Sequence, residues 1–146
     1  MLNPPIATKS MNSQITSHIM MVRPVGFRLN EQTSVNNYYQ TVLEGLSRED
    51  ANSRAIEEFD TFVQKLRMAD INVYVFQDDA VPDTPDSIFP NNWVSFHEDG
   101  RVVMFPMYAE NRRMERREEM FDILADDFGF EIREVEDFTH FEEIGL

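Results

Sequence analysis

The 146-residue chain has no cysteine and is poor in basic residues. Without cysteine it can form no disulfide, no zinc–thiolate bond and no thiol nucleophile of its own. Lys and Arg number 13 against 27 Asp and Glu, which gives a formal net charge of −14. This balance argues against binding to nucleic-acid phosphates or to an anionic membrane surface. No segment approaches the ~20 apolar residues of a membrane span.

The composition is that of one ordinary folded domain. Hydrophobic residues make up 42% of the chain and charged residues 27%, which suffices for a core. Residues 1–17 are polar and lack the apolar centre of a secretory signal, so we expect a flexible leader there. The absence of cysteine and of a signal fits a cytoplasmic protein.

Hydrophobic periodicity predicts an α/β fold in which strands and helices alternate. Ser47 is a suitable N-cap for a long amphipathic helix, and Asp99-Gly100 is a hairpin turn signal. The polar stretch 25–40 is predicted to be a long loop. Strands are expected at residues 18–22, 71–76, 92–97, 101–105 and 130–135, and helices at 47–69 and 111–128.

The densest group of chemically useful side chains lies at residues 84–93, between a loop and a strand. It combines the carboxylate of Asp86, the ring of Phe89 and the amides of Asn91 and Asn92. A carboxylate and amides beside an aromatic face suit a planar, nitrogen-rich group such as a guanidinium or a urea. The alternative is an ordinary turn-forming loop that ends at a buried Trp93.

Two arginines begin the second predicted helix. Positive charge at a helix N-terminus opposes the helix dipole, so Arg112 or Arg113 is a candidate clamp for a substrate carboxylate. The alternative is pairing with Glu115, Glu118 and Glu119 on a solvated helix face. The three histidines have no partner at metal-ligand spacing, so no metal site is predicted.

The run 85–93, the strand end 21–24 and the pair Arg112-Arg113 together resemble the N-terminal part of the pentein superfamily. This superfamily includes arginine deiminase, dimethylarginine dimethylaminohydrolase and the amidinotransferases. The citrulline-utilisation hydrolase group looks most similar, over residues 19–135. The resemblance implies that residues 18–146 are the N-terminal portion of a pentein domain, about two to two and a half blades of a five-bladed α/β propeller.

In the pentein family a cysteine thiolate attacks the substrate carbon and a histidine handles protons, and both lie in the C-terminal part. This chain has no Cys, so we expect no catalytic residue within it and no activity from it alone. The resemblance implies no cofactor. It implies two partners, an amino-acid substrate and the C-terminal half, supplied by the same protein or by another chain. The sequence does not decide whether the chain forms a homo-oligomer through an exposed sheet edge.

The resemblance also assigns substrate contacts. It places Asp86, Phe89 and Asn92 around the reacting group, with Asn91 beside them, and Arg112, or its neighbour Arg113, on the substrate carboxylate. The loop 24–40 would be a lid. Asn92 stands where dimethylarginine hydrolases carry a carboxylate, which favours the neutral ureido group of citrulline over a charged guanidinium. The alternative is a non-catalytic ligand-binding or structural α/β module of the same fold.

Overall fold

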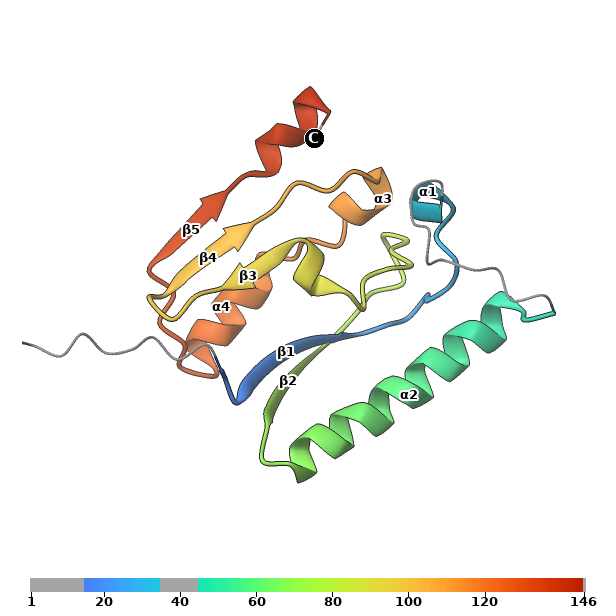
Figure 1. The fold of residues 1–146 in the computed structure, drawn as a ribbon, viewed down its shortest axis with the longest axis horizontal. Helices are drawn as coiled ribbons and strands as arrows, with labels where there is room; N and C mark the ends of the chain where they lie inside the picture. Colours follow the sequence, from blue (N-terminus) through green and yellow to red (C-terminus); the bar gives the residue numbers. More distant parts are fainter. Residues whose placement is uncertain (1–14, 35–44, 146) are drawn as a thin grey trace, which may run out of the picture.

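The computed structural model describes residues 15–34 and 45–145. Most of the predicted leader and residues 35–40 of the predicted lid therefore lie outside the described residues. The fold is mixed α/β, as predicted, and its strands form two small sheets (Figure 1). In one sheet, β1 (His18–Arg23) and β2 (Asn72–Gln77) pair in parallel. In the other, β4 (Arg101–Met104) lies between antiparallel β3 (Val94–Phe96) and parallel β5 (Glu134–Asp137).

The helix α2 (Arg48–Met68) connects β1 to β2 and covers one face of their sheet. It begins where the sequence predicts, because the Ser47 side chain accepts a 3.0 Å hydrogen bond from the Asp50 backbone N–H. Phe59 and Val63 of this helix form a buried cluster with Val73 of β2. The opposite, polar face of α2 is exposed.

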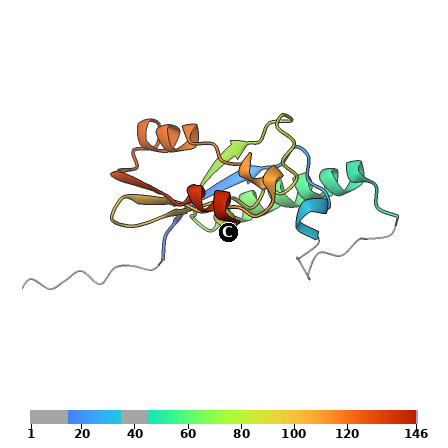
Figure 2. The same ribbon diagram turned by 90° about the horizontal axis from the view of Figure 1, so that it is seen from above.

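The second face of the β1–β2 sheet contributes to the larger core. Val22 and Phe76 pack there with Trp93, Val102 and Met120, which come from residues 93–126 further along the chain. The two strands lie between α2 and the sheet of β3, β4 and β5 (Figure 1), and α4 (Glu119–Asp126) lies on one side of that second sheet (Figure 2). The β1–β2 sheet is thus buried on both faces, which is why its strands read as apolar runs.

The prediction of one helix over residues 111–128 is wrong. The chain forms a short α3 (Glu110–Arg113), a turn, and α4 (Glu119–Asp126). Arginine side chains around the break make tertiary contacts in place of helix-surface pairs. Arg113 donates to the Met107 carbonyl at 2.9 Å, and Arg116 donates to both oxygens of Glu142 at 2.5 and 3.0 Å. These bonds stabilise the bend against helix propensity.

Three other boundaries differ from the prediction. The expected strand 130–135 begins only at Glu134, because Phe130 and Ile132 pack against the core before pairing with β4 begins. The expected strand 92–97 starts late, since Pro90–Asn92 form the 3-10 helix η1. The expected loop 25–40 contains a short helix, α1 (Glu31–Ser34). Near the C-terminus, residues Thr139–Ile144 form the 3-10 helix η2.

The C-terminal ends of β1, β2 and β4 point to the same end of the molecule (Figure 1). The segments that follow them, which are α1, the loop 78–89 and α3, meet there. In α/β proteins this end of parallel strands is where ligands bind, because the connecting loops converge on it.

Candidate functional site

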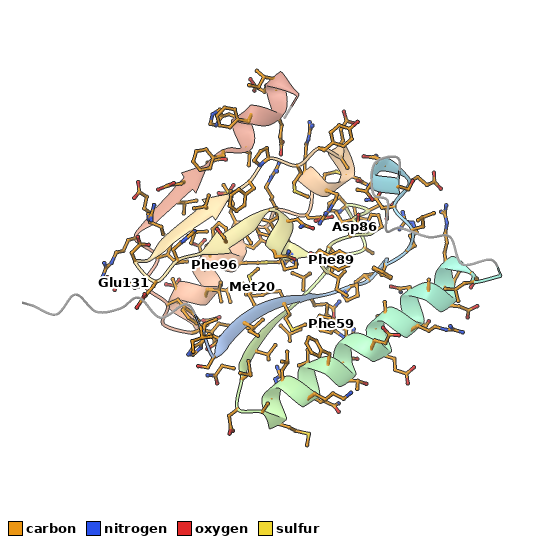
Figure 3. The ribbon with its side chains drawn as sticks, in the orientation of Figure 1. Met20, Phe59, Asp86, Phe89, Phe96 and Glu131 are labelled. Carbon is orange, nitrogen blue, oxygen red and sulfur yellow. The ribbon has the colours of Figure 1, made fainter. Side chains whose placement is uncertain are left out.

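Asp86 lies at this convergence, buried between α1 and α3 (Figure 3). Its oxygen Oδ2 accepts hydrogen bonds from Asn30 Nδ2 at 2.8 Å and Thr33 Oγ1 at 3.3 Å, and lies 3.8 Å from Arg112 Nε. Its other oxygen, Oδ1, accepts no hydrogen bond from any residue that the structure describes. No described side-chain oxygen is both buried and unpartnered, so Oδ1 reaches the solvent side. The protein thus holds the carboxylate through Oδ2, and Oδ1 is available to accept a hydrogen bond from a ligand.

A pair of amides holds the loop after β1 against α3. Asn111 Nδ2 donates to Asn30 Oδ1 at 2.9 Å, and Asn30 Nδ2 donates back to Asn111 Oδ1 at 3.3 Å. Asn30 is 1% exposed, and its Oδ1 also accepts from the Gln32 backbone N–H. Because Asn30 bonds Asp86 as well, this amide pair fixes the direction of the Asp86 carboxylate.

Arg112 is the buried centre of the site. Its Nε and Nη2 each donate a 3.0 Å bond to one oxygen of Glu115, which forms a two-bond ion pair. Its Nη1 donates to Asn92 Oδ1 at 2.8 Å, and Nη2 also reaches the Asp86 and Phe89 carbonyls at 3.4 and 3.3 Å. Arg112 therefore links Asp86 to Asn92, and most of its N–H groups donate to other residues of the protein.

Glu115 occupies a crowded acidic environment. Burial raises the pKa of Glu115 from 4.5 to about 7, even though Arg112 donates two hydrogen bonds to it. The negative charges of Asp86 and Asp78 add to the rise. Asp78, also buried, accepts a 2.6 Å bond from Ser87 Oγ. Glu115 and Asp86 thus flank the Arg112 guanidinium, and Asp78 adds a third buried carboxyl near Glu115.

The remaining predicted residues lie at the rim. Phe89 is 44% exposed and meets the ring of Phe27 edge-on, with centroids 6.4 Å apart. Asn91 and Asn92 are exposed, and the Asn91 side chain makes no hydrogen bond to a described residue. Arg113 points away from this group, because it donates to the Met107 and Tyr108 carbonyls. The structure thus gathers Asp86, Asn92 and Arg112, and leaves Arg113 apart. The roles of these residues toward a substrate stay predictions.

Sequence reasoning did not identify Asn30 and Thr33, which hold Asp86, or the buried Asp78. Each lies in a polar stretch of the sequence that gives no periodic signal of burial. Glu115 was named only as a partner for arginines on a solvated face. It does pair with Arg112, but the pair is buried, with side chains 1% and 11% exposed. The signal available in the sequence was the spacing of three residues between Arg112 and Glu115.

Two hollows lie away from Asp86. One, of about 610 Å³, lies between the β1–β2 sheet and the β3–β4 hairpin and includes His18, Tyr74 and Phe130. The other, of about 590 Å³, lies along β2. Within residues 15–34 and 45–145, no group of three or more acidic or histidine side chains is placed to hold a metal ion. In the same ranges, no helix is both long and apolar enough to span a membrane.

The fold and the loops define an α/β protein that collects a buried carboxylate, amides and a ring at the C-terminal ends of parallel strands. Residues 23–145 match the model of a family described as N,N dimethylarginine dimethylhydrolase, eukaryotic. The match covers most of the chain, so the chain belongs to this family and, through it, to the pentein superfamily. The resemblance noted in the sequence is thereby confirmed at the level of the superfamily. No curated protein and no solved structure matches the chain.

Proposed function

We propose that this chain is the N-terminal part of a pentein hydrolase that acts on the ureido or guanidino carbon of citrulline or an arginine-like amino acid. The observation that carries the proposal is the state of Asp86, a buried carboxylate with Oδ2 anchored and Oδ1 free. Such an oxygen can accept an N–H of the flat head group and hold it in one orientation. Phe89, Asn91 and Asn92 at the rim would complete the contact.

The chemistry would be supplied from outside residues 1–146, since the chain has no cysteine. A thiolate would form a carbon–sulfur bond with the head-group carbon, and the leaving nitrogen would take a proton from a histidine. Water would then break the carbon–sulfur bond and restore the thiolate. In this scheme Asp86 orients the substrate, while Arg112 and Arg113 are the candidates for its carboxylate. Arg112 would have to do this with the N–H that its internal bonds leave over.

We propose that the substrate is citrulline, because Asn92 takes the place of a carboxylate. A guanidinium is charged and carries only donors, so a carboxylate holds it best. The uncharged ureido group of citrulline has a carbonyl acceptor, to which an amide can donate.

We also propose that the fold is about two blades of a five-bladed propeller, with the other blades outside this chain. The second unit supports this: β4 and β5 are parallel, α4 connects them, and antiparallel β3 lies on the far edge of β4. In the first unit, β1, α2 and β2 take the same places. Among the described residues no strand corresponds to β3.

The edge of β2 that faces away from β1 is capped. Arg67 Nη2 donates to the Val73 carbonyl at 3.1 Å, and Arg117 Nη1 donates to the Gln77 carbonyl at 2.7 Å. Charged side chains on edge groups prevent another strand from pairing there. A further strand would therefore have to pair with β1.

The outer edge of β1 is open. Asn72 and Asp78 direct their N–H groups to carbonyls of Ser17 and Arg23, at 2.8 and 3.0 Å. Ser17 and Arg23 thus face β2. Because successive residues of a strand direct their backbone groups to opposite edges, Met20, which lies an odd number of residues from both, directs its N–H away from β2. An antiparallel strand could pair with this edge, as β3 does with β4. The Met20 amide should exchange with solvent freely in the isolated chain. In the assembled protein it should exchange at least about a hundredfold more slowly.

The test of the activity uses the protein isolated from its source cells through an affinity tag on the chromosomal copy of this sequence. Whichever polypeptide supplies the cysteine is then retained. Release of ammonia would be measured with L-citrulline and L-arginine, and release of dimethylamine with N,N-dimethylarginine. We expect citrulline to be hydrolysed fastest, and Asp86→Asn to lower kcat/KM by about ten- to a hundredfold, as for a lost bond to a charged group. Asp122→Asn, an exposed change on α4, is the matched control.

Hydrolysis of none of the three compounds would overturn the proposal. A protein that binds citrulline in calorimetry without hydrolysing it would instead be a ligand-binding module. Faster turnover of arginine than of citrulline would overturn the choice of substrate and leave the reaction class in place.

A further inference from the structure

We propose that the buried pair Arg112–Glu115 is a positioning device that turns the Asn92 amide so that it presents only N–H donors to the ligand, and that this selects a ureido over a guanidinium group. The inference rests on the proposed function, since it concerns how that site distinguishes its substrates. It assigns Arg112 a role inside the protein that does not require contact with a substrate carboxylate.

The first step is the identity of the Asn92 atom that faces Arg112. A guanidinium carries five N–H donors and no acceptor, so only the oxygen of an amide can bond to it. The 2.8 Å contact from Arg112 Nη1 therefore joins Asn92 Oδ1 and leaves Nδ2 on the other side. Asn92 is exposed, and its Nδ2 donates to no residue in the described part of the chain.

The second step is what this orientation offers to a ligand. With its oxygen turned toward Arg112, Asn92 presents its two N–H groups on the opposite side, where the ligand would lie. A ureido carbonyl can accept one of them. The corresponding nitrogen of a guanidinium is itself a donor, so it would meet Nδ2 donor to donor and leave both groups unpaired. A free amide could rotate by 180° and accept from either ligand, but the bond from Arg112 prevents this.

The third step is what holds Arg112. The other N–H groups of Arg112 bond to the protein as well. Nε and Nη2 each donate to one Glu115 oxygen, and Nη2 also donates to the Phe89 carbonyl. A fork with two parallel bonds has one geometry, and burial excludes the water that could replace it. The Asp86 carboxyl lies 3.8 Å from Arg112 Nε, and Asp86 and Asp78 both act electrostatically on Glu115. The guanidinium is thus held in place before any ligand binds.

The experiment compares kcat/KM for L-citrulline and L-arginine in the tagged protein isolated from its source cells. Arg112→Lys keeps the charge but loses the fork, and Glu115→Gln keeps the shape but loses one acceptor. We expect each to lower the ratio of citrulline to arginine about tenfold, the worth of one hydrogen bond, because Asn92 becomes free to rotate. Arg133→Lys, a change at an exposed arginine that pairs with Glu131, is the control and should leave the ratio unchanged.

A second readout separates positioning from general damage. Glu115 faces Arg112, Asp86 and Asp78, and it loses its proton near pH 7. The two-bond pair strengthens with that ionisation, so the preference for citrulline should rise across about pH 6 to 8 and should be flat in Glu115→Gln. A damaged fold would lower both substrates together and leave no such profile.

The outcomes separate the two proposals. If the unmodified protein hydrolyses neither compound, the proposed function fails and this inference fails with it. If the unmodified protein prefers citrulline, while both substitutions lower the two substrates by the same factor, the inference alone is wrong. If Arg112→Lys does not fold, the ratio and pH profile of Glu115→Gln still decide the matter.

Discussion

Arg112 Nη1 donates a 2.8 Å hydrogen bond to the side-chain oxygen of Asn92, across the β3–β4 hairpin that separates the two residues in the chain. The same guanidinium lies 3.8 Å from Asp86. One buried cation thus sets the relative position of the acid and the amide that the sequence suggests as ligand contacts.

Asn92→Asp should reverse the preference of the site. One oxygen of the new carboxylate would accept from Arg112, and the other would face the ligand as a charged acceptor. A guanidinium would then be favoured, because charge-assisted bonds are about twice as strong as neutral ones. We expect the ratio of kcat/KM for arginine over citrulline to rise at least about tenfold. Asn72→Asp, on an exposed position of β2, is the control, and an unaltered ratio in Asn92→Asp would contradict the prediction.

Asn30→Ala should destabilise the chain, because it removes bonds to Asp86 and to Asn111 at a fully buried position. Leaving these partners unpaired costs about 1–3 kcal/mol of unfolding free energy. Urea unfolding followed by circular dichroism measures the change. Asn72→Ala, which removes an exposed amide, should stay within about 0.5 kcal/mol of the unmodified chain. Equal stability of the two variants would show that the amide pair does not hold the site.

Glu115 should make the stability of the chain depend on pH. Its pKa is about 7 when folded and 4.5 in the ordinary state, so between these values the folded chain binds more protons. Its contribution is therefore full below about pH 4.5 and is lost as the pH rises through about 7. The loss is about 3 kcal/mol at most. Urea unfolding at about pH 5 and about pH 8 should give a smaller difference in Glu115→Gln than in the unmodified chain.

The pH range over which Glu115 affects stability differs from the range over which carboxyls with a lowered pKa affect it. The bond from Arg28 lowers the pKa of Asp83 below 3.8, so its contribution is present above that value and is lost in acid. Comparing the two proteins at each pH removes such shared contributions. If the unmodified chain loses no more stability between the two pH values than Glu115→Gln does, the raised pKa of Glu115 is wrong.

Gly100→Ala should cost more stability than Gly129→Ala, although both residues have positive φ, +85° and +75°. A Cβ at Gly100 would lie 2.7 Å from the Glu131 carbonyl oxygen, whereas one at Gly129 would meet nothing within 4 Å. Both changes bring the strain of a left-handed residue, about 1–2 kcal/mol, and only the first adds a clash with backbone. Thermal unfolding of the two variants measures the difference, and equal midpoints would count against the close approach of Glu131 to the hairpin turn.

Local pattern was sufficient for much of the fold. The N-cap at Ser47, the apolar run of β1 and the Asp99-Gly100 turn lie where the sequence indicates, because each depends on neighbours in the chain. The start of β5 at Glu134 and the division of the second helix were not predictable in this way. Both depend on partners distant in sequence, such as Glu142 for Arg116.

The candidate site divides along the same line. The sequence by itself determined which residue types are available, that is Asp86, Asn92 and the Arg112-Arg113 pair, and it determined the absence of any thiol. Only the tertiary structure decided that Arg112 points inward to Glu115 while Arg113 points away, and that Asn30 anchors Asp86. The reason is physical: side-chain types follow from the sequence, but the direction of a buried hydrogen bond is set by which donors and acceptors the folded chain brings within reach.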